Sequence, residues 1–371
     1  IQLNDLLPFQ MKVKNDIIQT LEANSRGIVV MPTGAGKTRT TVEAIIQYLN
    51  SNTKPISKVI WLADRDELCE QAFQTFKEII VNRASHPVTL WRFWKGNDLK
   101  FLSEETQSIE GIVVTSIQQL RNRFEKHDPM AINLLNSCEI VVIDEAHRNI
   151  DWNHSLITYL QRQANTPGII GISATPMRRN RSESGKLARI FNNNPITPIL
   201  GGEKDLDEVT KTLVHQGILA KKINLSADDL NLEVTFGTPN SRLKQSYQVI
   251  NSLIEKGSKS MLVFAEDVQQ SKYLSSALMI NGVSASHIDS STSTMERSRI
   301  IHDFRVGQIS VLINYGILTT GFDAPNTDAI AIFRETDDTN QPVIRQMVGR
   351  GLRGPRFGGT ESCMVFIRGE N

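Results

Sequence analysis

The stretch Ile28 to Thr38 reads I-V-V-M-P-T-G-A-G-K-T and decides the fold class. It opens with a β-branched apolar run, typical of a buried strand, and continues into a glycine-rich turn and a helix that begins near Lys37. A turn in that position can point its backbone N–H groups at phosphates, and the helix N-terminus adds a partial positive charge. The sequence therefore predicts a phosphate-binding loop between a strand and a helix.

The residues of this loop have separate expected roles. Lys37 is expected to contact the terminal phosphates of a nucleotide, and Thr38 is expected to bind a Mg²⁺ ion. Gly34 and Gly36 let the backbone turn its N–H groups inward. The residues expected to line the nucleotide are Thr33, Gly34, Ala35, Gly36, Lys37 and Thr38.

A second motif, V-V-I-D-E-A-H, runs from Val141 to His147. It places Asp144 and Glu145 at the carboxyl end of a predicted strand, where ligands of open α/β sheets bind. We expect Asp144 to hold the Mg²⁺ ion through water, and Glu145 to orient and deprotonate the attacking water. An Asp-Glu pair after a strand can also be a surface turn, and the phosphate loop upstream favours the catalytic interpretation.

A third motif, Q-M-V-G-R-G-L-R, runs from Gln346 to Arg353. Arg350 and Arg353 are three residues apart, so we predict that both project from one face of a helix. Arg353 is the expected finger that stabilises charge on a γ-phosphate, with Arg350 and Gln346 in the same catalytic set. A solvated face or a salt bridge is the alternative for the two arginines taken alone.

Composition sets the broad class. The chain has 371 residues, a 40% hydrophobic share and a formal net charge of +1. Its length favours two domains, no apolar run is long enough to cross a bilayer, and the charge gives no global argument for nucleic acid. The scattered cysteines, Cys69, Cys138 and Cys363, predict neither zinc nor disulfides. Because the chain starts at Ile1 without methionine, we expect a fragment of a longer protein.

Apolar β-branched runs alternate with helical stretches in two series. This pattern predicts an α/β protein with two tandem P-loop-type domains, each a mostly parallel sheet with helices on both faces. The expected domains are residues 1–178 and 241–371, the second one truncated, with a connector at residues 179–240 in which residues 205–219 are helical. The expected strands are residues 28–31, 59–62, 112–114, 140–143 and 169–172, then 261–264, 284–288, 310–313, 329–333 and 364–367.

The motifs resemble those of helicase superfamily 2, of the DEAH-box type, in order and along nearly the whole chain. Met31, where the general loop pattern has a glycine, is in line with helicase-like loops. The segment A-D-R-D-E-L-C-E-Q from Ala63, D-E-A-H-R and G-F-D-A-P are most similar to the motor subunits of type I and type III restriction enzymes and related bacterial DNA-repair translocases. The other matching motifs are L-L-P-F-Q, V-V-T-S, S-A-T, V-F-A-E and L-T-T-G-F-D, which begin at residues 6, 113, 173, 263 and 318.

The resemblance implies two RecA-like lobes that hydrolyse ATP with Mg²⁺ and bind a nucleic-acid strand through its phosphate backbone. It implies an adenine contact at Gln10, a nucleotide contact at Gly321, and a contact of Asp323 with the ribose or with the opposing motif. It also implies coupling of the γ-phosphate to lobe closure through His147, Ser173 and Thr175. The implied strand contacts are Arg65, Thr115, Ser116, Thr319 and Thr320. Phosphate contacts carry no sequence information, so binding without sequence preference is expected.

The track and the biology stay open at this stage. We expect a DNA helicase or translocase, and the alternatives are an ATP-gated clamp without processive movement and an RNA helicase. The resemblance favours 3′ to 5′ movement and the bacterial cytoplasm. Trp91, Phe93 and Trp94 alternate at strand spacing, which favours core packing over base stacking. A basic segment from Arg178 to Arg189 is expected to be a solvated linker.

Overall fold

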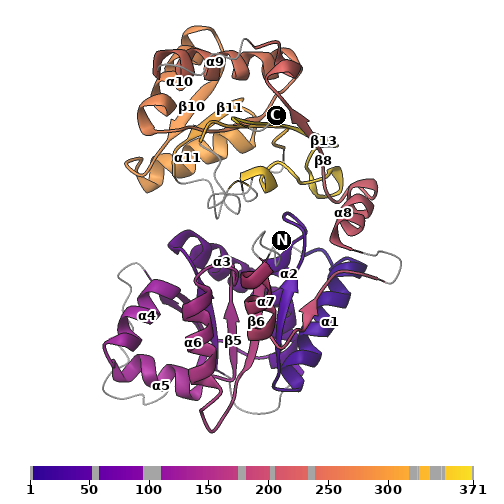
Figure 1. The fold of residues 1–371 in the computed structure, drawn as a ribbon, viewed down its shortest axis with the longest axis vertical. Helices are drawn as coiled ribbons and strands as arrows, with labels where there is room; N and C mark the ends of the chain where they lie inside the picture. The colour runs from indigo at the N-terminus through magenta and orange to yellow at the C-terminus, as the bar shows by residue number, and fades with distance from the viewer. Residues whose placement is uncertain are drawn as a thin grey trace. The chain divides into compact units, whose positions relative to one another are not determined.

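The computed structural model describes residues 3–51, 58–94, 110–173, 181–200, 205–232, 239–316, 324, 326–334, 344 and 347–369. The chain forms two compact units, one of residues 1–32 and 36–209 and the other of residues 33–35 and 210–371. Each unit is built on a parallel sheet with helices on both faces (Figure 1). None of the described helices combines the length and the hydropathy that a membrane crossing requires.

The first unit has a seven-stranded sheet in the order β3-β4-β2-β5-β6-β1-β7, and all its strand pairs are parallel. The strands are β1 Arg26–Val30, β2 Lys58–Ala63, β3 Leu90–Phe93, β4 Gly111–Ser116, β5 Ile140–Ile143, β6 Gly168–Ser173 and β7 Pro195–Ile196. The helices are α1 Pro8–Glu22, α2 Lys37–Ser51, α3 Asp66–Arg83, α4 Ile117–Glu125, α5 Pro129–Ser137, α6 Ile150–Leu160 and α7 Arg181–Ile190.

Both faces of this sheet are covered. Side chains of α4 to α7 form one buried cluster with alternate residues of β1, β2, β4, β5 and β6. On the opposite face α1, α2 and α3 pack against one another, and the buried Trp61 of β2 meets Phe76 of α3 with ring centroids 5.4 Å apart. The strands are therefore apolar on both sides, which is why they read as continuous hydrophobic runs in the sequence.

The second unit has a six-stranded parallel sheet in the order β10-β11-β9-β12-β13-β8. Helices α9 and α10 join the buried cluster on one face, and α11 joins the cluster on the other. The strands are β8 Lys221–Leu225, β9 Met261–Phe264, β10 Ala285–Ile288, β11 Val311–Asn314, β12 Ala329–Ile332 and β13 Ser362–Ile367. The helices are α8 Leu206–His215, α9 Pro239–Glu255, α10 Val268–Ile280 and α11 Thr294–Arg305, with short 3-10 turns at Asp228–Leu230 and Pro355–Phe357.

The two-sheet α/β architecture and all ten expected strands are confirmed, as is the helix within residues 205–219. Three further strands were not among the expected ones: β3, and the strands β7 and β8 within the expected connector. The segment 179–240 does more than connect, because its β7 pairs with β1 in the first sheet and its β8 pairs with β13 in the second. Both are short or polar edge strands, so they lack the apolar run that marks a central strand.

The aromatic segment at the end of β3 packs into the core, as expected. Phe93 and Trp94 are buried, and Trp91 is partly buried with its indole N–H donating to the Glu110 carbonyl at 2.9 Å. The Arg92 guanidinium lies 4.2 Å from the ring centroid of Phe73 and bonds to Glu70. These aromatic side chains therefore make their contacts with other protein groups, as core packing requires.

A stability test follows from the close approach of β6 to α7. A Cβ at Gly171 would lie 2.6 Å from the ring of Phe191, which is fully buried. Gly171→Ala is expected to destabilise the first unit by about 1–3 kcal/mol and to lower its melting temperature by several degrees, because the ring cannot move into solvent.

The matched control is Gly185→Ala in α7, where an added Cβ meets only the tip of Arg189 at 3.8 Å. Alanine is the better helix former, so this change is expected to stabilise by roughly 0.5–1 kcal/mol. Calorimetry of both variants checks the pair. A fall in melting temperature for both would contradict the packing argument.

Candidate nucleotide-hydrolysis site

The phosphate loop lies between β1 and α2, in the strand-turn-helix order expected of it. Gly34 and Gly36 adopt φ values of +85° and +84°, in the left-handed region that favours glycine. A Cβ at Gly36 would also lie 2.7 Å from Nε2 of Gln10. The buried Gln10 amide therefore lies directly against the loop, where an adenine reader is expected, and its Oε1 accepts a hydrogen bond from the Leu7 N–H at 3.0 Å.

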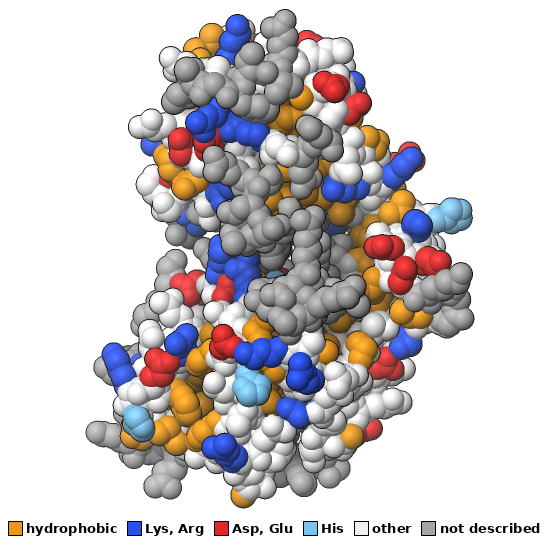
Figure 2. Space-filling view, viewed as in Figure 1, with side chains coloured by type: hydrophobic (Ala, Val, Ile, Leu, Met, Phe, Trp, Pro, Cys, Tyr) orange, Lys and Arg blue, Asp and Glu red, His pale blue; other side chains and the backbone are white. Residues whose placement is uncertain are grey.

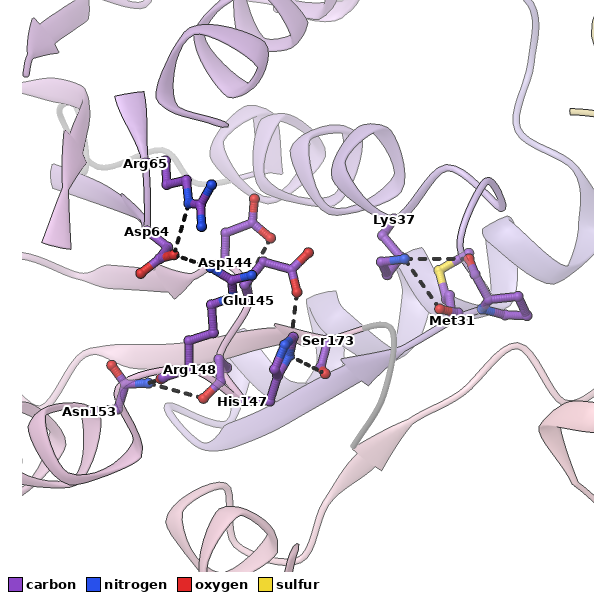
Figure 3. A network of polar contacts seen from close by, with 12 residues as sticks. Met31, Lys37, Asp64, Arg65, Asp144, Glu145, His147, Arg148, Asn153 and Ser173 are labelled. Atoms are coloured by element: carbon purple, nitrogen blue, oxygen red, sulfur yellow. Dashed lines mark hydrogen bonds and ion pairs between the residues drawn. The ribbon is translucent and has the colours of Figure 1, made fainter. Parts of the chain in front are cut away.

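Lys37 is the first residue of α2 and its ammonium lies within the loop. Its Nζ donates to the carbonyls of Met31 and Pro32 at 3.3 Å and 3.4 Å, as Figure 3 shows. The Thr40 hydroxyl, in the first turn of α2, donates a hydrogen bond to the Gly36 carbonyl at 3.0 Å. The loop thus holds a positive charge and a helix N-terminus at one place, and both attract phosphate.

The carboxylate pair lies at the carboxyl end of β5. Ile143 pairs with Leu62 of β2, and the Asp144 N–H donates to the Leu62 carbonyl at 2.8 Å. Oδ1 of Asp144 in turn accepts from the Glu145 N–H at 2.9 Å. Glu145 has a φ of +50°, which is rare for a residue with a side chain and is often found at functional sites. The neighbouring strand ends therefore meet at one sheet edge.

Burial perturbs the first carboxylate. The Asp144 side chain is 5% exposed, and desolvation together with the negative charge of Glu145 raises its pKa to about 7. The Glu145 N–H and the positive charge of Lys37 act in the opposite direction. Asp144 and Lys37 are therefore close enough to interact electrostatically, which places the carboxylate beside the phosphate loop.

The turn that follows Glu145 is held by buried hydrogen bonds. His147 is 2% exposed, and its Nδ1 lies 2.9 Å from the Ser173 hydroxyl of β6 and 3.3 Å from Glu145 Oε2. Asn153 of α6 is fully buried and donates from Nδ2 to the carbonyls of Ala146 at 3.0 Å and Arg148 at 2.8 Å. The structure therefore brings His147 and Ser173 together with Glu145, as the coupling role requires.

Two positioning residues of this turn were not predicted. Asn153 lies one helical turn into α6, and Asp64 follows β2 and accepts hydrogen bonds from Arg148 at 2.6 Å and Asn149 at 3.0 Å. A sequence signal existed for Asp64, since it is a carboxylate directly after a predicted buried strand. Asn153 had none, because an asparagine in a helix is usually exposed.

The expected strand contacts of the first unit lie at the ends of β2 and β4, and only one is well exposed. Arg65 has a side chain 41% exposed to solvent. Thr115 is fully buried, and the Ser116 hydroxyl caps α4 by accepting from the Gln119 N–H at 3.2 Å. Both hydroxyls are thus engaged inside the protein, and Arg65 is the side chain of this group that is open to a phosphodiester.

The predicted helical face of the two arginines is wrong. Residues 347–349 are helical and Arg350 is already in a turn, whereas Arg353 forms an antiparallel bridge with Leu219. After Arg350 the backbone bonds to the segment 218–220, with the Ala220 N–H donating to the Leu352 carbonyl and the Gly354 N–H donating to the Ile218 carbonyl at 3.0 Å each. The chain leaves its helix to lie against the second sheet, and the catalytic role of Arg353 stays a prediction.

Several predicted residues lie outside the described part of the chain. They are Thr175, Thr319, Thr320, Gly321, Asp323 and Gln346.

The described residues fit a magnesium nucleotide. The φ of +84° at Gly36 favours glycine, and Lys37 supplies the cation that terminal phosphates need. The Thr38 hydroxyl and the Asp144 carboxylate are hard oxygen donors of the kind that Mg²⁺ prefers. Glu145 Oε2 is buried 3.3 Å from His147 Nδ1, and it accepts no hydrogen bond from the described residues.

Comparison with known families agrees with this site. The family model "Type III restriction enzyme, res subunit" matches residues 4–178, and the model "Helicase conserved C-terminal domain" matches residues 245–354. The chain belongs to helicase superfamily 2. Members of this superfamily use ATP with Mg²⁺, so the phosphate loop of this helicase-family chain is an ATP site.

Individual relatives extend the comparison. The ATP-dependent helicase IRC3 of Saccharomyces cerevisiae is 28% identical over 364 residues, covering 94% of this chain and 49% of the relative. The helicase-family chain spans about half the length of the curated relatives it matches. Saccharomyces cerevisiae Dbp5 bound to RNA and ADP BeF3 superposes with a TM-score of 0.63 at 18% identity, covering 97% of this chain and 84% of that chain. Mycobacterium smegmatis helicase Lhr bound to ssDNA and AMP-PNP gives 0.64 at 16% identity, covering 96% and 46%. At such identities the likeness shows the fold.

Nucleotide affinity separates the roles of two site residues. Lys37→Ala removes charge-assisted hydrogen bonds to phosphate and is expected to weaken Mg·ATP binding by at least about tenfold. Glu145→Gln is expected to keep affinity within about threefold and to slow hydrolysis by about a hundredfold or more. Fluorescent-nucleotide titration and phosphate release measure both effects. Lys12→Ala in α1 is the control, and equal ATP affinity in the Lys37 and Glu145 variants would contradict the assignment.

The pKa of Asp144 predicts a pH-dependent stability. Its folded-state pKa of about 7 lies above the ordinary 3.8, so its contribution to folding is fully present below pH 4 and is lost as the pH rises through 7. Without Mg²⁺ and nucleotide, Asp144→Asn is expected to raise the melting temperature at pH 8 by at least about 2 °C and to change it little at pH 5.

Thermal unfolding in EDTA at the two pH values makes this measurement. The control is Asp207→Asn, at an exposed position in α8. Its effect on the melting temperature is expected to be the same at pH 5 and at pH 8. An Asp144→Asn variant that tracks the parent protein at pH 8 would contradict the prediction.

Proposed function

We propose that this chain is the motor core of a nucleic-acid-dependent ATPase that translocates on DNA. The carrying observation is the arrangement of Lys37, Asp144 and Glu145 at one sheet edge, with Glu145 linked through His147 to Ser173. Phosphoryl transfer needs positioning and charge neutralisation, and these residues supply both. Arg353 remains the candidate for the arginine that stabilises the transition-state charge.

In this proposal the chain's own residues divide the chemical work. Lys37 and the loop N–H groups hold the phosphates, while Thr38 and Asp144 hold the magnesium ion, which neutralises phosphate charge when bound. Glu145 orients the attacking water and takes its proton at a carboxylate oxygen. His147 and Ser173 connect Glu145 to the end of β6, which leads into the segment of the S-A-T motif.

Strand binding is proposed to act through the phosphodiester backbone. Arg65 is exposed at the carboxyl end of β2, close in the chain to the site. On the face shown in Figure 2, Lys and Arg side chains are interspersed with Asp and Glu side chains in both units. Local contacts therefore support the proposal better than a broad basic field, and we expect binding without strong sequence preference.

DNA is the proposed track because the first unit matches the restriction-enzyme family model over residues 4–178. The solved neighbours do not discriminate, since one was captured with RNA and another with single-stranded DNA. Relatives named as RNA helicases also match at low identity.

The deciding experiment is ATP turnover with and without nucleic acid. Single-stranded DNA of several sequences is expected to raise kcat at least about tenfold, and RNA of the same length is expected to do so less. Triplex displacement, driven by ATP along duplex DNA, then tests movement. Glu145→Gln is the matched control for contaminating ATPase.

Each outcome has a defined meaning. No stimulation by any nucleic acid would overturn the proposed function. Stronger stimulation by RNA would move the track to RNA. Stimulation without triplex displacement or strand separation would favour an ATP-gated clamp.

A further inference from the structure

The corner between β2 and α3 lies beside the turn that carries the catalytic carboxylate. β2 and β5 are parallel neighbours in register, with Leu62 opposite Ile143, so both strands end at the same level of the sheet. The residues that follow are Asp64 and Arg65 on one strand and Asp144 and Glu145 on the other. The Asp64 side chain thus lies between Arg65, the expected strand contact, and the turn that carries Glu145.

Asp64 joins the two with both of its oxygens. Its Oδ2 accepts from Arg148 Nη1 at 2.6 Å, and its Oδ1 accepts from Asn149 Nδ2 at 3.0 Å. The Asp64 and Arg148 side chains are only 16% and 18% exposed, so solvent screens this pair less than a surface pair. Asn149 has a φ of +51° and precedes α6, yet its side chain makes no cap and bonds to Asp64. Two residues of one turn are therefore held by one carboxylate.

Arg148 passes this restraint to Glu145. The Arg148 N–H donates to the Glu145 carbonyl at 2.8 Å, and Asn153 holds the Arg148 carbonyl at 2.8 Å. Glu145 has a positive φ of +50°, a conformation that persists only when its surroundings maintain it. A movement of Arg148 is therefore expected to change the direction of the Glu145 side chain.

Arg65 competes for the same carboxylate oxygen. Its Nε lies 3.8 Å from Asp64 Oδ2, which is a long contact, and its side chain is 41% exposed. Figure 3 shows Arg65 and Arg148 approaching Asp64 from different sides. A phosphodiester bound by Arg65 would be expected to draw this arginine away from Asp64, whose hydrogen bonds to Arg148 and Asn149 would remain.

We propose that Asp64 is a positioning residue through which strand binding at Arg65 is transmitted, by way of Arg148, to the catalytic Glu145. This inference rests on the proposed nucleic-acid-dependent ATPase and adds the route by which the strand stimulates it. In this proposal Asp64 needs no contact of its own with nucleotide or strand. It acts through the turn that holds Glu145.

The first test is Asp64→Asn, which keeps an oxygen for Asn149 and removes the charge that Arg148 pairs with. ATP turnover is measured with and without saturating single-stranded DNA, together with DNA affinity. The stimulation ratio is expected to fall at least tenfold, while DNA affinity stays within about threefold. Glu70→Gln is the matched control, because it breaks the exposed Arg92–Glu70 pair of the same unit and should leave the ratio unchanged.

Arg148→Gln removes the same ion pair from its other side. We expect it to lower the stimulation ratio as Asp64→Asn does, and the double variant to be no worse than either single variant, as for residues that act as one unit. Arg148→Gln also decides the matter if Asp64→Asn does not fold.

The failures can be told apart. If the parent protein is stimulated by no nucleic acid, the proposed function fails and the inference fails with it. If the parent and the folded Asp64→Asn variant are stimulated equally, only the inference fails. A parallel loss of unstimulated and stimulated turnover with a lower melting temperature, or loss of folding in both variants, would assign the pair to stability and overturn the inference.

Discussion

The site depends on the parallel arrangement of β1, β2, β5 and β6, because parallel neighbours end at the same sheet edge. The phosphate loop follows β1, Asp64 follows β2, and the Asp144–Glu145 pair follows β5. Buried apolar strands keep these ends in register, and the burial they create also removes water from Asp144. The same packing that positions the Asp144 carboxylate raises its pKa, so the fold disfavours the charged form of this group. A magnesium ion bound to phosphate is the kind of cation that would stabilise the charged Asp144 carboxylate.

The turn from Glu145 to Asn149 shows how local strain is maintained. Both of these residues have positive φ values, and each such residue costs on the order of 1 kcal/mol. The turn is held at its sides by Asn153, by His147 with Ser173, and by Asp64. These bonds reach it from α6, β6 and β2, so it is restrained by the whole sheet edge. A catalytic carboxylate held in this way changes direction when one of its supports changes.

The second unit also has a parallel sheet, but its segment with Arg350 and Arg353 differs from the expected helix. Arg350 and Arg353 were expected on a helix, and the described chain instead turns at Gly351 and pairs Arg353 with Leu219. Tertiary packing determines the course of this segment. Gly351 lies so close to the second sheet that no side chain would fit between them. Two backbone hydrogen bonds hold this segment antiparallel to residues 218–220: the Ala220 N–H donates to the Leu352 carbonyl, and the Gly354 N–H donates to the Ile218 carbonyl.

The sequence by itself determined the fold class, the central strands and the placing of Lys37, Asp144 and Glu145 at strand ends, because apolar periodicity and glycine turns are local signals. It missed the edge strands β7 and β8, whose short or polar runs acquire strand structure only by pairing with β1 and β13. Tertiary structure alone decided that Thr115 is buried and that Asp64 supports the catalytic turn from the end of β2. Hydrogen bonds between residues 84 or more positions apart, such as Asp64 with Arg148, leave no periodic trace in a sequence. Whether a polar side chain meets solvent, a backbone carbonyl or another charge depends on which elements the fold brings beside it.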